Sequence, residues 1–137
     1  MRTYDQNDII TRLPYDLLTR ELPKLLREKA HAPQRQVHDL PEQACLLLMP
    51  AWSKALGGVK IVNVTPGNGA RHLPCVAASY LLFDAVTGEH LALLDGGELT
   101  ARRTAAVAAI AADRLAVDGA HNLLLVGSGR IASELAF

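Results

Sequence analysis

The feature that most constrains this chain is a glycine-rich loop close to its C-terminal end. The loop Gly127-Ser-Gly129-Arg-Ile-Ala132 follows the apolar run 123–126, and this order predicts a strand, a tight turn and the start of a helix. The first glycine permits the turn, the second lets a ligand approach the backbone, and a small third residue lets helix and strand pack closely. We interpret the loop as a dinucleotide phosphate site, with an ordinary strand–helix turn as the alternative.

The loop lies at the end of the 137 residues. An acidic residue that binds the ribose is expected about 20 residues after such a loop, and the sequence ends before it. We therefore expect a first domain over residues 1–119 and only the incomplete start of a Rossmann domain over residues 120–137. The expected fold class is α/β, with mixed strands and helices in the first domain.

Hydrophobic periodicity predicts the elements between the termini. Helices are predicted over 14–30, which Pro23 kinks or splits, over 96–116, and from 130 to 137. Asp95 is the expected N-cap of the second helix, in a capping box with Glu98. Residues 31–43 are expected as extended chain or loop. Strands are predicted at 45–49, 59–64, 76–83, 90–94 and 121–126, with a hairpin connection at 84–89 and a turn at 118–119.

Composition excludes several classes of protein. Fourteen basic residues balance fourteen acidic ones, which argues against a nucleic-acid or membrane-surface partner. No apolar run approaches the roughly 20 residues of a membrane span, and no secretory signal is visible, so a cytoplasmic location is expected. Cys45 and Cys75 form no CxxC pair and the five histidines are scattered. Neither a disulfide framework nor a metal site is therefore expected.

Two cations fall on faces that are otherwise apolar. Arg103 shares a helical stripe with Leu99, Val107 and Ile110, so it is expected to be buried and to need an anionic partner. That partner is either a ligand carboxylate or a structural carboxylate of the same domain. Arg102 points about 100° away and is expected to be solvated or paired locally.

Lys60 is likewise a cation on an otherwise apolar face, here on a strand. It alternates with Val59 and Ile61 and shares a face with Val62 and Val64. A lysine at such a position lies either at the wet end of the strand or in a pocket.

The order of these residues resembles the ornithine cyclodeaminase/mu-crystallin family of NAD(P)-dependent enzymes. The matching segments are Gly58 to Asn68, Leu73-Pro74, Leu81 to Asp84, Thr87-Gly88, Ala92 to Gly96, Leu99-Thr100, Arg103 to Ala106 and Val126 to Gly129. The resemblance implies an N-terminal domain that binds substrate and dimerises, followed by a Rossmann domain. It also implies hydride transfer between a nicotinamide and the α-carbon of an amino or imino acid.

The resemblance also implies roles for individual residues. Lys60 matches the catalytic lysine that contacts the substrate carboxylate and polarises the reacting carbon, while Arg103 and Arg35 match the arginines that bind that carboxylate. Cys75 stands where many members carry a threonine near the nicotinamide. Leu47 stands where ornithine-using members carry a glutamate, so a ketimine or a small neutral amino acid suits this sequence better. The residues implied to bind the cofactor are Cys75, Gly127, Gly129, Arg130 and Ala132.

The sequence and the resemblance together lead to an expected cofactor, substrate and assembly. The complete enzyme is expected to use NAD or NADP, to bind a small amino or imino acid and to form a homodimer. The chain alone is expected to bind the cofactor weakly or not at all, because most of the nucleotide crevice is missing from it. The alternative is a non-catalytic, mu-crystallin-like binding or dimerisation protein that is inactive because it is truncated.

Overall fold

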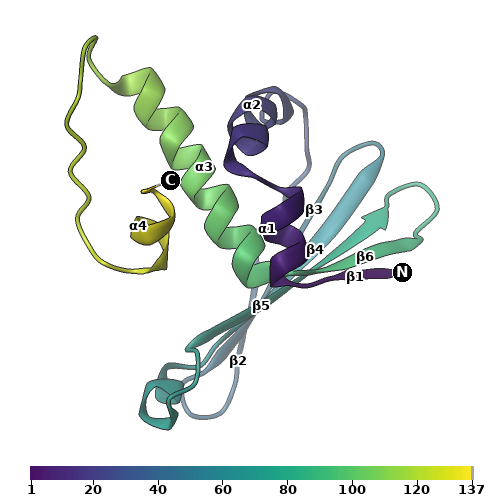
Figure 1. Cartoon of the computed structure of the whole chain (residues 1–137). Coiled ribbons are helices and arrows are strands. Elements are labelled where there is room, and N and C mark those ends of the chain that lie inside the picture. Colours follow the sequence, from purple (N-terminus) through teal and green to yellow (C-terminus); the bar gives the residue numbers. More distant parts are fainter. Residues whose placement is uncertain (137) are drawn as a thin grey trace.

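A computed structural model describes residues 1–136 and has a mixed α/β architecture built on one six-stranded sheet (Figure 1). The strand order is β1-β6-β5-β4-β3-β2. β1 runs parallel to β6 and every other neighbouring pair is antiparallel. The expected α/β class is confirmed. The strands are β1 (Arg2–Tyr4), β2 (Gln36–Asp39), β3 (Cys45–Trp52), β4 (Leu56–Val64), β5 (Val76–Asp84) and β6 (His90–Asp95).

The main helices lie together on one side of the sheet (Figure 1). The long helix α3 packs closely there, because a Cβ built on Gly96 would lie only 2.7–2.9 Å from backbone atoms of Ala78 and Ser79. Glycine at the first turn of α3 therefore sets how near the helix comes to β5. The helices are α1 (Gln6–Arg12), α2 (Tyr15–Leu25), the 3-10 helix η1 (Pro66–Arg71), α3 (Gly96–Leu115) and α4 (Arg130–Glu134).

The central antiparallel strands confirm the alternation read from the sequence. Val62 on β4 and Ala92 on β6 are each only 5% exposed, and they mark the face of the sheet that the helices cover. In the expected hairpin connection, the Asp84 carboxylate accepts hydrogen bonds from the backbone N–H groups of Val86 and Thr87, each at 2.8 Å. Gly88 follows with a φ of +75°, a conformation that suits glycine.

The N-terminal region differs from expectation. The helix predicted over 14–30 is the shorter α2, which continues through Pro23 without splitting and ends at Leu25. Leu25 and Leu26 are 55% and 65% exposed, so nothing packs on the last part of the apolar stripe to hold it helical. β1 and α1 were not predicted, although Asp5 and Asp8 form a reciprocal capping box at the start of α1.

The strand predicted at 121–126 is not formed. Residues 117–129 contain no helix or strand, and Leu124 and Val126 are 86% and 91% exposed. A strand needs a hydrogen-bonded neighbour, and no segment among residues 1–136 pairs with this one. The turn at 118–119 and a helix beginning at 130 are present. The predicted helix end at Phe137 lies outside the described residues.

Candidate anion-binding site

Lys60 lies in the middle of β4, on the face of the sheet that the helices cover. It pairs with Met49 on β3 and with Tyr80 on β5, and Val62, on the same face, is buried. Lys60 is itself half-buried. Lys60 therefore does not lie at the wet end of the strand.

Two further cations lie near Lys60. Gln36 pairs with Leu48, so Arg35, one residue earlier, extends that register to Met49, the neighbour of Lys60. Arg103 comes from α3, above the sheet. Burial lowers the pKa of Lys60, and the positive charges of Arg103 and then Arg35 lower it further. Arg103 and Arg35 are thus each close enough to Lys60 to disfavour its positive charge.

These three cations have no carboxylate partner among residues 1–136. Ion pairs in this part of the chain involve other basic residues, namely Arg20, Lys24, Arg71, Arg102 and Arg130. Like charges gathered at a half-buried position raise the free energy of the empty site. An anion placed among them would remove this repulsion.

The expected burial of Arg103 is wrong, and of the two alternatives for Arg102, a solvated side chain or a local pair, the structure has the pair, with Glu98. Arg102 is only 8% exposed, whereas Arg103 is exposed. The face of α3 that packs most closely is formed by alanines, among them Ala101, Ala105 and Ala106, which are at most 2% exposed. The stripe of larger residues Leu99, Val107 and Ile110 predicted a different face, and these residues are only partly buried. Small residues mark this interface because they let the helix come close.

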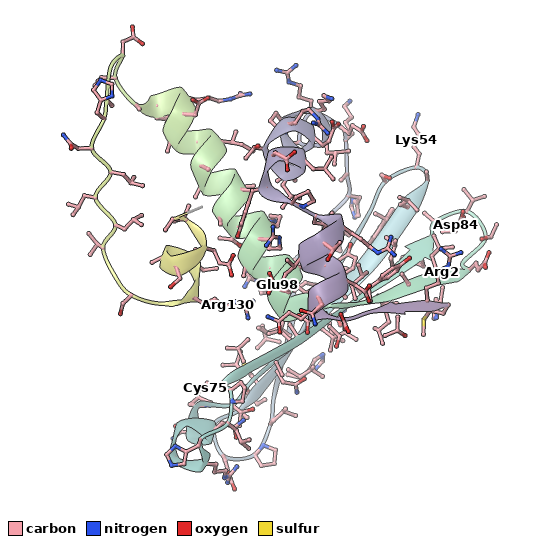
Figure 2. The ribbon with its side chains drawn as sticks, viewed as in Figure 1. Arg2, Lys54, Cys75, Asp84, Glu98 and Arg130 are labelled. Carbon is pink, nitrogen blue, oxygen red and sulfur yellow. The ribbon has the colours of Figure 1, made fainter. Side chains whose placement is uncertain are left out.

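Glu98 organises a second, structural cluster at the start of α3. Its carboxylate is 2% exposed and lies 3.7 Å from Nη1 of Arg102. It also accepts hydrogen bonds from Nε2 of Gln6 at 3.2 Å and from Nη2 of Arg130 (Figure 2). The Asp95 carboxylate caps α3 by accepting from the Glu98 N–H at 2.7 Å. The predicted N-cap is therefore present, but the Glu98 side chain binds these cations instead of completing the capping box.

The glycine loop leads into α4 without the strand that its motif requires before it. Gly127 has a φ of +110°, and Gly129 is the N-cap of α4. Nothing lies within 4 Å of a Cβ built on either glycine, so the loop backbone is open to approach. Arg130 points to Glu98, and Ala132 lies within α4.

Cys75 does not lie with this loop. It precedes β5 at the far end of the sheet, where its Sγ is 3.8 Å from the carbonyl oxygen of Pro66, whereas Arg130 lies beside α3 (Figure 2). The described residues thus bring Arg35, Lys60 and Arg103 together, and separately the residues of the loop. Tyr80 next to Lys60 was not predicted, because finding it requires the β4–β5 register.

Residues 1–136 contain no group of three or more His, Cys, Asp or Glu residues arranged to hold a metal ion. No helix in that range is long and apolar enough to cross a membrane.

Comparison with known proteins identifies the family. The model of the ornithine cyclodeaminase/mu-crystallin family matches residues 10–136. The Delta(1)-pyrroline-2-carboxylate/Delta(1)-piperideine-2-carboxylate reductase of Azospirillum brasilense is 36% identical over 137 residues, covering 97% of this chain and 44% of that protein. The chain therefore spans less than half the length of this relative.

Solved structures give the same result. An archaeal alanine dehydrogenase dimer with bound NAD has a TM-score of 0.78 at 29% identity, over 87% of this chain and 38% of that one. The Thermococcus litoralis Delta(1)-pyrroline-2-carboxylate reductase in complex with NADH and L-proline has a TM-score of 0.74 at 31% identity, over 85% of this chain and 38% of that one. The chain belongs to the ornithine cyclodeaminase/mu-crystallin family.

Proposed function

We propose that this chain is the substrate-binding portion of an NAD(P)-dependent oxidoreductase that acts at the α-carbon of an imino or amino acid. The observation that carries the proposal is the group formed by Arg35, Lys60 and Arg103, which has no anionic partner among residues 1–136. An α-carboxylate supplies the missing negative charge. It also belongs to the substrates in the names of the relatives.

Each cation would have a distinct part in holding this carboxylate. The planar guanidinium of Arg103 would bind both oxygens, which fixes the direction of the bond to the α-carbon. Arg35 would add a second contact from the edge of the sheet. Lys60 would contact the carboxylate and hold a proton at Nζ beside the reacting carbon, where its positive charge favours electron withdrawal from that carbon.

The loop from Gly127 to Ala132 would hold the dinucleotide. The positive φ of Gly127 and the open space beside both glycines fit the close approach of a pyrophosphate. When bound, the nicotinamide supplies or accepts the hydride. Residues 1–119 would then form the substrate domain and residues 120–137 the start of the nucleotide domain. Cys75 as a neighbour of the nicotinamide remains a prediction.

The substrate is proposed to be a compact imino acid or a small neutral amino acid. Leu47 lies two residues from Met49 on β3 and pairs with Val62, so it faces the same side of the sheet as Lys60. An apolar side chain there offers no partner for the distal amine of ornithine. A cyclic α-imino acid suits this surface better, as does alanine.

A homodimer is the proposed assembly. The sheet face opposite the helices is apolar and none of its central residues is fully buried, although such a surface is normally covered. One of the similar structures is described as a dimer. The central apolar residues of this face are Leu46, Leu48, Val59, Ile61, Leu81 and Leu93.

Light scattering on the chain and its variants tests this assembly. Ile61→Glu would place a charge at the centre of the apolar face and should shift a dimer toward monomer. Lys54→Glu, at the exposed hairpin between β3 and β4 (Figure 2), is the control and should leave the dimer intact. A clean monomer for the unmodified chain at micromolar concentration would rule the proposal out.

The experiment for the function uses a full-length protein that carries this sequence. Arg103→Ala should weaken binding of the α-imino acid by about 1.5–3 kcal/mol, because it removes the charge-assisted hydrogen bonds that this exposed arginine would donate to the carboxylate. Arg103→Lys should recover only part of the loss, because an ammonium does not reproduce the bidentate contact. Arg114→Ala, on the exposed end of the same helix, is the matched control. Equal losses in the Arg103→Ala and Arg114→Ala proteins would refute the site.

A further inference from the structure

Tyr80 lies next to the three cations but takes no part in the proposed chemistry. It is the direct cross-strand neighbour of Lys60 on β5 and projects from the same face of the sheet. On its other side it pairs with Leu94 of β6. Any ligand held over Lys60 therefore lies beside the Tyr80 ring.

The direction of the ring is fixed by Gly58. A Cβ built on Gly58 would lie 2.1 Å from the Tyr80 oxygen, 2.3 Å from Cζ and 2.5 Å from Cε1. The ring therefore crosses diagonally from β5 to β4 and occupies the space that a side chain at position 58 would fill. It stands as a wall on the Gly58 side of Lys60.

The hydroxyl oxygen of Tyr80 is not fully buried. The Tyr80 oxygen has no hydrogen-bond partner among residues 1–136, yet no buried side-chain oxygen or nitrogen there lacks a partner. Its oxygen is therefore not sealed in the core, although partial burial raises the pKa of the phenol.

We propose that Tyr80 sets the size limit of the site and restricts the ligand carboxylate to those carried on a compact group, such as a single five- or six-membered ring. This inference rests on the proposed function, since it assumes that the carboxylate binds at Lys60 and Arg103. A fused or branched group on the α-carbon would meet the Tyr80 ring on the Gly58 side. A pocket wall that excludes extra carbon atoms favours the smaller ligand over the larger one by about 10–200-fold.

Two planar carboxylates measure this limit in the 137-residue chain. Pyrrole-2-carboxylate carries one ring, and indole-2-carboxylate presents the same carboxylate on a fused pair of rings. Calorimetry should show pyrrole-2-carboxylate binding at least about tenfold more tightly than indole-2-carboxylate. Tyr80→Val should reduce that ratio to about threefold or less, and Tyr80→Phe, which keeps the ring, should preserve it.

Controls separate this inference from the function on which it rests. Phe83→Val removes a ring from the same strand on the opposite face and should leave the ratio unchanged. Tyr80→Leu is the second test if Tyr80→Val does not fold. If pyrrole-2-carboxylate binding depends on Arg103 but the ratio is the same with and without the Tyr80 ring, the size limit is refuted and the proposed function stands. If neither ligand depends on Arg103, the proposed function fails first.

Discussion

Arg102 places its guanidinium carbon 4.2 Å from the centroid of the Tyr15 ring. Its Nε donates a hydrogen bond to the carbonyl oxygen of Leu13 at 2.8 Å, and Nη1 lies 3.7 Å from the buried Glu98 carboxylate. One side chain of α3 thus joins the end of α1 to the start of α2. The next residue in the sequence, Arg103, belongs instead to the cation group around Lys60. We therefore expect these two adjacent arginines to have separate roles, Arg102 in stability and Arg103 in ligand binding.

Arg102→Ala should destabilise the fold by about 3 kcal/mol, because it removes a hydrogen bond and a cation–π contact and leaves Glu98 with less compensation. Urea denaturation of the 137-residue chain measures this change. Arg103→Ala is the matched substitution and should alter the free energy of unfolding by about 0.5 kcal/mol or less. Equal destabilisation by the two substitutions would contradict the separation of roles.

Tyr15 should make stability depend on pH in the alkaline range. Burial, together with the hydrogen bond to the Glu134 carboxylate, raises its pKa from 10.0 to about 12. The folded chain therefore holds the phenol proton where the unfolded chain loses it, so this contribution is complete below pH 10 and is lost as the pH rises to about 12. Denaturation curves between pH 9 and 12 should show a smaller alkaline loss for Tyr15→Phe. Parallel pH profiles for both proteins would exclude this role.

Gly96→Ala should destabilise the chain by about 1–3 kcal/mol, as overpacking does. The added Cβ would meet the backbone of Ala78 and Ser79 at under 3 Å, and backbone of a central strand does not yield as a flexible side chain would. Thermal unfolding followed by circular dichroism measures the loss. Gly67→Ala, where nothing lies within 4 Å, is the control, and a melting temperature equal to that of the control would show that α3 does not need glycine there.

The predictable parts of the fold are those that local pattern determines. The alternation in β4 and β5 and the cap at Asp95 depend on neighbouring residues, so the sequence indicated them. The burial of Arg102 depends on Leu13 and Tyr15, which are distant in sequence, and an alanine-rich helix gives little periodic signal of which face is packed. The run at 123–126 has the composition of a strand, but a strand also depends on a neighbour that residues 1–136 do not provide.

The residues of the candidate site also divide into those that a local sequence pattern marks and those that it does not. Lys60 and Arg103 stood out because each is a cation on an apolar stripe, although Arg103 proved to be the exposed arginine. Arg35 was found only through resemblance to the family, since no local pattern marks it. Tyr80 required the register that pairs it with Lys60, which single-sequence patterns do not determine.

The pKa of the Lys60 ammonium, followed by side-chain NMR in the 137-residue chain, shows whether Arg35, Lys60 and Arg103 form one anion site. We expect a value below the usual 10.5 without ligand, because burial and then the charges of Arg103 and Arg35 disfavour the protonated form. Pyrrole-2-carboxylate should raise it, and Arg103→Ala should both raise the ligand-free value and diminish the response to ligand. A Lys60 pKa that neither the carboxylate nor the removal of Arg103 alters would show that these cations do not form one anion site.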